Sequence, residues 1–258
     1  MFDLSNYPIV LIFFIGLASI LAVSEIGWQL GIHLKGRAGS SFSTLESAML
    51  GLMALMLAFT FSMALSRFES RRDAVLGEAN AIGTTALRGR LLPEPQRSET
   101  LKLLRAYVQI RLEIVQSETS LAERTLAVNR SNALQEALWQ QAKAMASIDK
   151  GPVPTGLFIQ SLNDMIDSQG KRLSALRNRI PNSVLITLFG IAAVAGASAG
   201  YASVRDTERA RLPVYVMGLL VSAVIFLIID LDRPSAGFIT NSQQPMVDLA
   251  ASMATFSD

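Results

Sequence analysis

The sequence predicts an all-α integral membrane protein with four transmembrane helices and a helical cytoplasmic insertion between the second and third. Three observations lead to this prediction. Of the 258 residues, 50% are hydrophobic and only 17% are charged, whereas soluble domains carry about 25% charged residues. The apolar residues gather in four blocks, each close to the roughly 20 residues that a membrane-spanning helix needs. No segment alternates apolar and polar residues as a β-strand does.

The first two spans lie near the start of the sequence. The first covers about residues 9–32, and Trp28 near its end is typical of a membrane interface. Glu25 is either a functional group inside the membrane or a carboxylate at headgroup depth. The second span covers about residues 45–66, and no Gly or Pro separates it from the residues that follow. We therefore expect a single helix that leaves the membrane and continues to about Leu92.

The segment between the second and third spans is predicted to be helical throughout. Pro93 and Pro95 would end the long helix, because proline cannot continue a helical hydrogen-bond ladder. Apolar residues then recur at gaps of three and four, which makes one face of a helix. Such stripes comprise Leu101, Leu104, Val108, Leu112 and Val115, and later Leu134, Leu138, Ala142, Met145 and Ile148. We interpret these stripes as core packing rather than as a ligand pocket.

The third and fourth spans complete the membrane part. Pro181 would open the third span, at about residues 183–204, which is rich in small residues. Gly196 and Gly200 have the four-residue spacing that lets two helices approach closely in lipid. The fourth span covers about residues 212–229. The predicted organisation is therefore 1–66 for the first two spans, 67–181 for the helical domain, 182–232 for the last two spans and 233–258 for a C-terminal tail.

The distribution of basic residues predicts the topology. Four spans put both termini and the insertion on one side of the membrane. That side carries eight basic residues near the membrane: Arg67, Arg71, Arg72, Lys171, Arg172, Arg177, Arg179 and Arg233. The other side carries five: Lys35, Arg37, Arg205, Arg209 and Arg211. Because basic residues favour the cytoplasmic side, the termini and the inserted domain are predicted to be cytoplasmic.

The composition argues against several kinds of chemistry. The chain has no cysteine and a single histidine, His33, so thiol chemistry and histidine metal clusters are excluded. Basic residues are spread over several loops, which disfavours nucleic-acid binding. No phosphate loop, nucleophile elbow or zinc-protease motif occurs, and we predict no catalytic residue, metal site or cofactor. Carboxylates such as Glu69 are interpreted as solvated, or as partners of an arginine three residues on, here Arg72.

The second span carries the most informative pattern. At about 100° per residue, five of its residues fall within roughly one quadrant of the helix. They are Leu52, Leu55, Phe59, Ser62 and Ser66. This face is apolar for two turns, then carries hydroxyls, and ends beside Arg67. In several copies around an axis it would form a hydrophobic constriction that gates ions; alternatively, the same residues face lipid or other helices.

Two segments resemble bestrophins. Leu57-Ala58-Phe59, followed eight residues later by Arg67, is similar to the second-span signature of that family, in which two tryptophans follow the arginine; here Phe68 and Glu69 stand in their places. A second similarity lies after the fourth span, at residues 230–234, Gly237 and residues 245–249. The chain resembles most an uncharacterised bacterial group called bestrophin-like, over nearly its full length, with matching stretches at 67–85, 91–95 and 230–249.

The resemblance implies a homopentamer in a bacterial inner membrane, in contact with lipid, with the second span around a central pore for inorganic ions. Leu55 and Phe59 match two positions of the family's apolar pore neck, and Leu52 would substitute for Gly51 at a third. Arg67, Asp230 and Asp232 would lie at the pore mouth or take part in packing. Because only two carboxylates replace the acidic cluster of the calcium-gated animal members, we do not expect calcium gating.

Three functional hypotheses follow. The first is an oligomeric ion channel with its neck at Leu55 and Phe59. The second is a non-conducting scaffold or sensor whose helical domain binds a protein partner. The third hypothesis is a membrane enzyme, which is the least favoured because the sequence shows no cluster of polar residues that could converge on a substrate. The second-span face separates the first two, because a conducting pore needs it to face a symmetric axis, whereas a scaffold could bury it against the other three spans.

Overall fold

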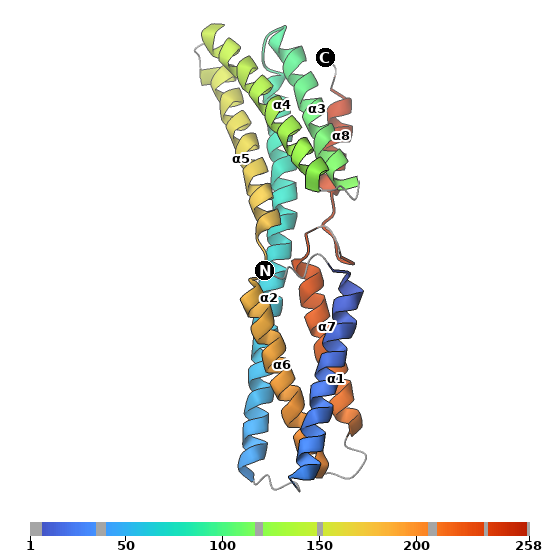
Figure 1. Ribbon diagram of the computed structural model, residues 1–258. Coiled ribbons are helices and arrows are strands. Elements are labelled where there is room, and N and C mark those ends of the chain that lie inside the picture. The colour runs from blue at the N-terminus through green and yellow to red at the C-terminus, as the bar shows by residue number, and fades with distance from the viewer. Residues whose placement is uncertain are drawn as a thin grey trace. The chain divides into compact units, whose positions relative to one another are not determined.

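The computed structural model describes residues 7–34, 40–116, 121–148, 152–205, 211–234 and 237–256, and all regular structure within them is helical. The chain divides into two compact units (Figure 1). The membrane unit comprises Met1–Glu69 and Asn178–Thr240, and the helical unit comprises Ser70–Arg177 and Asn241–Asp258. Helix α2 (Ser40–Gly89) contributes residues to both units.

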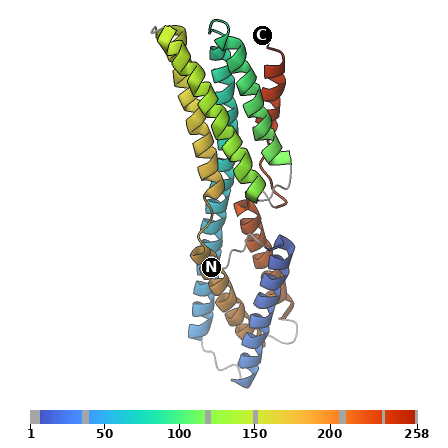
Figure 2. The ribbon, with the colours of Figure 1, turned by 45° about the horizontal axis from the view of Figure 1, so that its top comes forward.

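The membrane unit contains α1 (Ile9–His33), α6 (Asn182–Ala202), α7 (Arg211–Asp232) and the N-terminal part of α2. Four helices in the described residues are long and apolar enough to cross a membrane, as predicted. These four helices contain α1, the N-terminal part of α2, α6 and α7. Helix α1 packs mainly on α6 and α7. Figure 2 shows the same neighbours from a second direction.

Prolines set the beginnings of the spanning helices. Pro8 immediately precedes α1, and Pro181 immediately precedes α6, as expected. Both have a ψ angle outside the helical region, and the Pro181 carbonyl accepts a hydrogen bond from the backbone N–H of Val184 at 2.9 Å. Pro213 lies in the first turn of α7, where its missing N–H breaks no helical hydrogen bond.

The helical unit packs α3 (Gln96–Gln116), α4 (Leu121–Ile148), α5 (Leu157–Arg177) and α8 (Gln244–Ala254) with the C-terminal part of α2. A short turn, Pro152–Gly156, connects α4 and α5. The core is drawn from all five helices and includes Ile82, Leu104, Leu138, Leu162 and Met246, all fully buried. The helical interpretation of the insertion is thus confirmed within the described ranges.

Two details concern the ends of this unit. Helix α2 ends at Gly89, three residues before the predicted end near Leu92. The predicted tail contains α8, which groups with the insertion rather than standing alone. Arg105 Nη2 on α3 donates to the Phe256 carbonyl at 2.9 Å, and Met253 is buried. Lys35, Arg37 and Arg209, used to predict the topology, lie outside the described residues.

Candidate functional site on helix α2

Helix α2 buries one face in the membrane unit. Met53, Thr60 and Ala64 are almost fully buried, and at about 100° per residue they lie within about 40° of one another. Thr60 Oγ1 donates to the Met56 carbonyl at 2.7 Å, so its hydroxyl needs no other polar partner. This part of α2 is therefore held by a narrow face of small and flexible side chains.

The five residues predicted for the ion pathway lie on the opposite face, about 140° around the helix. Leu52 and Leu55 are each 50% exposed and Phe59 is 62% exposed. The serines that follow are exposed as well. We name this set the α2 stripe: Leu52, Leu55, Phe59, Ser62 and Ser66. None of its side chains is buried within the chain.

Beyond the α2 stripe the same face carries carboxylates. Glu69 and Asp73 follow Ser66 at helical spacing and are exposed. Two neighbouring arginines lie on other faces of the helix. Arg67 is partly buried and lies about 100° from the centre of the stripe, and Arg71 is only 2% exposed and lies about 140° from it. The suggested Glu69–Arg72 ion pair is not formed in this described part of α2. The exposed face is therefore acidic just beyond its hydroxyls.

Asp230 and Asp232 anchor backbone at the end of α7. Asp230 is 1% exposed, and its two carboxyl oxygens accept the backbone N–H groups of Phe238 and Ile239, each at 2.9 Å. A Cβ on Gly237 would lie 2.4 Å from Asp230 Oδ1, so only glycine fits this turn. Asp232 Oδ1 accepts the Ile180 N–H at 2.9 Å, just before α6. Both carboxyl groups thus fix the connections of the spanning helices.

Glycines set the contact between α1 and α6. A Cβ on Gly200 would lie 2.0 Å from the backbone oxygen of Ser24, and one on Gly27 would lie 2.0 Å from that of Ala197. Gly196 faces the Ser24 hydroxyl, which is 3.0 Å from its ideal Cβ position. The two helices therefore touch backbone to backbone, as small residues permit in lipid.

The ends of the spans carry polar contacts. Tyr215 on α7 donates to a carboxyl oxygen of Glu25 at 3.0 Å. The Arg211 guanidinium stacks over the Trp28 ring, 3.5 Å from its centroid. Both contacts suit the boundary between hydrocarbon and headgroups, where Trp and Arg are favoured.

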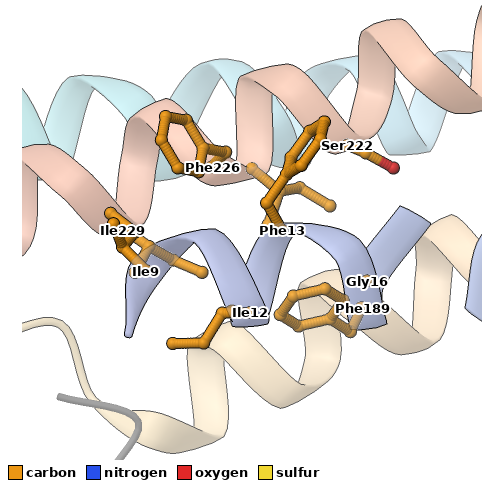
Figure 3. Close-up of a pocket in the computed structure, with 9 residues that line it drawn as sticks. Ile9, Ile12, Phe13, Gly16, Phe189, Ser222, Phe226 and Ile229 are labelled. Atoms are coloured by element: carbon orange, nitrogen blue, oxygen red, sulfur yellow. The ribbon is translucent and has the colours of Figure 1, made fainter. Parts of the chain in front are cut away.

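The cavities of the membrane unit are apolar. One of about 10 Å³ lies between α1, α6 and α7, and is lined by Phe13, Phe189 and Phe226 among others (Figure 3). Its one polar side chain, Ser222, donates to the Gly218 carbonyl at 2.8 Å. Such a space holds at most one water molecule. A shallow groove of about 250 Å³ runs between α2 and α6, lined by Met49, Leu52, Gly190, Ile191 and Val194.

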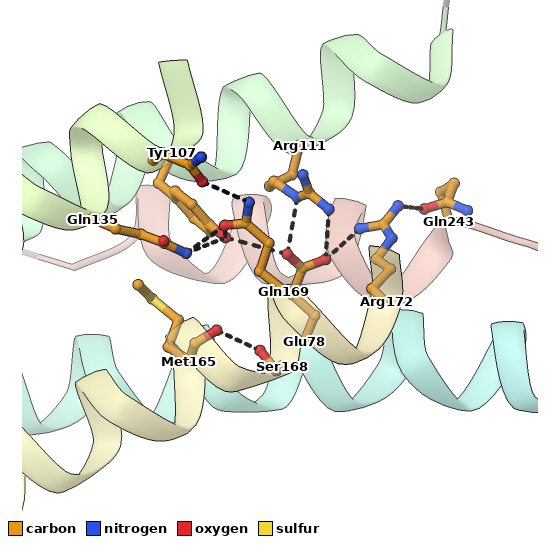
Figure 4. A network of polar contacts seen from close by, with 10 residues as sticks. Glu78, Tyr107, Arg111, Gln135, Met165, Ser168, Gln169, Arg172 and Gln243 are labelled. Atoms are coloured by element: carbon orange, nitrogen blue, oxygen red, sulfur yellow. Dashed lines mark hydrogen bonds and ion pairs between the residues drawn. The ribbon is translucent and has the colours of Figure 1, made fainter. Parts of the chain in front are cut away.

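A buried charged network, which the sequence did not single out, lies in the helical unit (Figure 4). Glu78 on α2 is fully buried. Its carboxylate oxygens lie 2.9 Å from Nε and 3.2 Å from Nη2 of Arg111 on α3, and they also form an ion pair with Arg172 on α5. Tyr107 Oη donates to Gln169 Oε1 at 2.8 Å and lies 3.3 Å from Glu78 Oε1. Burial, and then the charge of Glu78, raises the pKa of the Tyr107 phenol, which stays protonated.

Within the described residues no group of three His, Cys, Asp or Glu side chains is placed to hold a metal ion. The carboxylates of Asp230 and Asp232 in the membrane unit accept backbone N–H groups. What the membrane unit offers instead is a long unburied face of α2, which is apolar at one end and carries hydroxyls and Glu69 at the other.

These features define an α-helical membrane protein with four spans. The Bestrophin-like domain model matches residues 45–246 of the chain, so the protein belongs to the bestrophin-like family. A crystal structure of a bacterial Bestrophin homolog from Klebsiella pneumoniae, 16% identical, superposes with a TM-score of 0.65 and covers 95% of each chain. A point mutant of that homolog, 14% identical, gives 0.67 over 93% of this chain and 99% of the other.

A further solved structure, described as a membrane protein, is 15% identical, with a TM-score of 0.64 over 92% of this chain and 98% of that one. At these identities the superpositions show a shared fold. No match was found among curated proteins.

Proposed function

We propose that this protein is an oligomeric ion channel in which the α2 stripe of each copy faces a central pathway. The observation that carries the proposal is the exposure of that stripe: Leu55 and Phe59 are half or more exposed although they are large and apolar. Copies arranged around an axis would turn them into an apolar neck that gates by dewetting. Neither an enzyme nor a cofactor-binding protein is needed to account for such a surface.

The change of polarity along the face favours water over lipid as its environment. Hydroxyls at Ser62 and Ser66 lead to the carboxylates of Glu69 and Asp73. The hydroxyls lie within the predicted span, and the carboxylates beyond residue 66 would line the aqueous mouth of the pathway. A scaffold could bury the stripe against the other three spans, and within the described chain the stripe is left unburied, as a pore-facing surface would be.

The same geometry supports a preference for inorganic cations. Glu69 and Asp73 continue the α2 stripe, while Arg71 is buried on the far side of the helix. A ring of carboxylates attracts cations and repels anions. The cationic side chain next to the stripe in sequence, Arg67, is partly buried and contributes less to the pathway.

Neutralising the two carboxylates is expected to weaken that preference. In a tenfold gradient of a monovalent salt, a perfectly selective pore reverses at about 59 mV. The double variant Glu69→Gln/Asp73→Asn should move the reversal potential toward zero. Glu99→Gln, which removes an exposed carboxylate from α3, should leave it unchanged. Equal reversal potentials in the double variant and the parent would contradict the role of Glu69 and Asp73.

The deciding experiment is a recording of currents from the purified oligomer in planar bilayers. Phe59→Ala should raise the unitary conductance, because truncating the largest side chain of the stripe widens the neck. The matched control is Phe14→Ala, which truncates an equally exposed phenylalanine on α1. Silence of a verified oligomer across voltage, pH and calcium, or a Phe59→Ala conductance equal to the parent's, would refute the proposed neck.

The proposed assembly and membrane rest on the family resemblance, and the proposed topology rests on the distribution of basic residues. We propose a homopentamer in a bacterial inner membrane, in contact with lipid, with termini and the helical unit in the cytoplasm. The mass of the protein–detergent complex tests the assembly, since a monomer or dimer cannot enclose a central pathway. Protease protection in oriented vesicles tests the topology, because exposed segments of the helical unit should be cleaved only from the cytoplasmic side.

A further inference from the structure

Helices α1 and α7 run side by side in opposite directions within the membrane unit (Figure 1). Phe13, near the start of α1, packs against Phe226 on α7, with ring centroids 5.5 Å apart. Trp28, near the end of α1, meets Arg211 at the start of α7. The seam between these two helices therefore changes from aromatic to charged as it approaches the end of α1.

The Arg211 guanidinium is held in place without the use of its hydrogen-bond donors. Its central carbon lies 3.5 Å from the centroid of the Trp28 ring. At this distance the two planes must be nearly parallel, because an edge-on guanidinium would push a nitrogen into the ring. Within the part of the chain that the structure describes, Arg211 forms no ion pair or hydrogen bond. Its donors therefore remain available to an anion that accepts two parallel N–H groups, such as a phosphate.

A carboxylate lies on the same seam, one turn deeper in the membrane unit. Glu25 precedes Trp28 by three residues, about 4.5 Å of rise along α1, and is partly exposed. One of its oxygens accepts the Tyr215 hydroxyl at 3.0 Å. No lysine or arginine among the described residues forms an ion pair with it. The polar end of the seam, which we define as Glu25, Trp28, Arg211 and Tyr215, thus presents a cation and an anion that are not paired with each other.

The surroundings of this polar end indicate a ligand that belongs to a lipid. Trp and Arg at the end of a span are typical of headgroup depth. One turn deeper, exposed apolar residues continue on both helices, Ala22 on α1 and Leu219 on α7, where they would contact acyl chains. A headgroup that carries both charges suits the site better than a purely anionic one, because an anion on Arg211 would also meet the Glu25 carboxylate.

We propose that the polar end of the α1–α7 seam binds a phospholipid with a phosphoethanolamine headgroup, its phosphate on Arg211 and its ammonium on Glu25. Two methylene groups join the two charges of this headgroup, a length comparable to the rise between Trp28 and Glu25. A primary ammonium donates three hydrogen bonds, whereas the trimethylammonium of phosphocholine donates none. Glu25 therefore distinguishes the two headgroups, and Arg211 holds the phosphate that both share. The site does not include the α2 stripe, so it is independent of the proposed channel.

Trp28 can report the binding directly. The chain has two tryptophans, and Trp139→Phe leaves Trp28 as the only one. This full-length parent is reconstituted in phosphatidylcholine bilayers that contain a small fixed fraction of a lipid with brominated acyl chains, which quench tryptophan fluorescence on contact. Brominated phosphatidylethanolamine should be enriched at Trp28 about fivefold over brominated phosphatidylcholine, which corresponds to about 1 kcal/mol. Stepwise methylation of the amine should lower this enrichment stepwise, because each methyl group removes a donor.

Two substitutions separate the contacts of the site. Glu25→Gln keeps an acceptor for Tyr215 but has no charge for the ammonium, so the enrichment over phosphatidylcholine should disappear. Arg211→Gln should abolish the enrichment of brominated phosphatidylethanolamine over a brominated diacylglycerol, which has the same chains and no phosphate. The matched control is Glu113→Gln, which neutralises an exposed carboxylate of the helical unit and should change neither ratio. Because each result is a ratio of quenching, a change in the brightness of Trp28 itself does not affect it.

Equal quenching by brominated phosphatidylethanolamine and phosphatidylcholine in the parent would overturn the proposal. An enrichment retained in Glu25→Gln or in Arg211→Gln would overturn the contact assigned to that residue. If Glu25→Gln does not assemble, the methylation series tests the same contact in the parent, and an enrichment that methylation leaves unchanged would overturn it. Soluble phosphoethanolamine at millimolar concentration should not relieve the quenching, and relief would overturn the assignment to a lipid in favour of the free zwitterion.

Discussion

Gly200→Ala should largely abolish the folded membrane unit. The new Cβ would lie 2.0 Å from the Ser24 carbonyl oxygen and 2.9 Å from its carbonyl carbon, so backbone rather than a flexible side chain would have to move. We expect a cost of at least about 3 kcal/mol, the upper end for overpacking a well-filled core. The measurement is the yield and thermal midpoint of the oligomer in detergent.

Two other glycines of α6 provide graded controls. Gly196→Ala should be milder, because the nearest atom, at 3.0 Å, is the Ser24 hydroxyl oxygen, which can rotate away; Gly196→Leu should impair assembly. Gly190→Ala should be tolerated, since nothing lies within 4 Å of its ideal Cβ position. Equal stability of the alanine variants at positions 200 and 190 would contradict the close approach of α1 and α6.

Asp230→Ala should be the most damaging substitution at the end of α7. It leaves the N–H groups of Phe238 and Ile239 without their acceptor in a partly buried turn, next to the buried Asp230 carboxylate. Leaving a buried donor without its partner costs roughly 1–3 kcal/mol, so for two partly buried donors we expect a total loss of about 3 kcal/mol. The thermal midpoint of the purified oligomer measures it.

The control for this substitution is Asp248→Ala on α8. That carboxylate accepts only an exposed hydrogen bond from Gln244, one turn away, so its removal should be nearly neutral. Asp230→Asn should fall between the two, since an amide keeps one acceptor oxygen. A midpoint unchanged in Asp230→Ala would show that the turn is held by other contacts.

The sequence predicted those parts of the fold that local pattern determines. The spans followed from hydropathy, Pro181 marked the beginning of α6, and the unbroken run through Arg72 predicted that α2 extends beyond its span. The spacing of Leu101, Leu104 and Val108 predicted their burial in α3. The α2 stripe also came from helical period alone, and its role in conduction stays a prediction.

Other features depend on residues that are distant in the chain. Glu78 and Arg172 are 94 positions apart, and neither carries a local signal that predicts their pairing. The sequence left Asp230 undecided between pore mouth and packing, because its two N–H partners follow eight and nine residues later in an irregular segment. The orientation of Arg71, inward rather than into the pathway, required the packed structure as well.

The pairing of α1 with α6 and α7 has a consequence for biosynthesis. Helix α1 leaves the ribosome first, yet its main partners are encoded about 150 residues later, which at 5–20 residues per second means a wait of roughly 8–30 s. Throughout this interval the surface of α1 around Gly27, which later contacts the backbone of α6, faces lipid or the insertion machinery. The nascent chain therefore needs a temporary neighbour for α1, and the membrane unit closes only when the last spanning helix has been made.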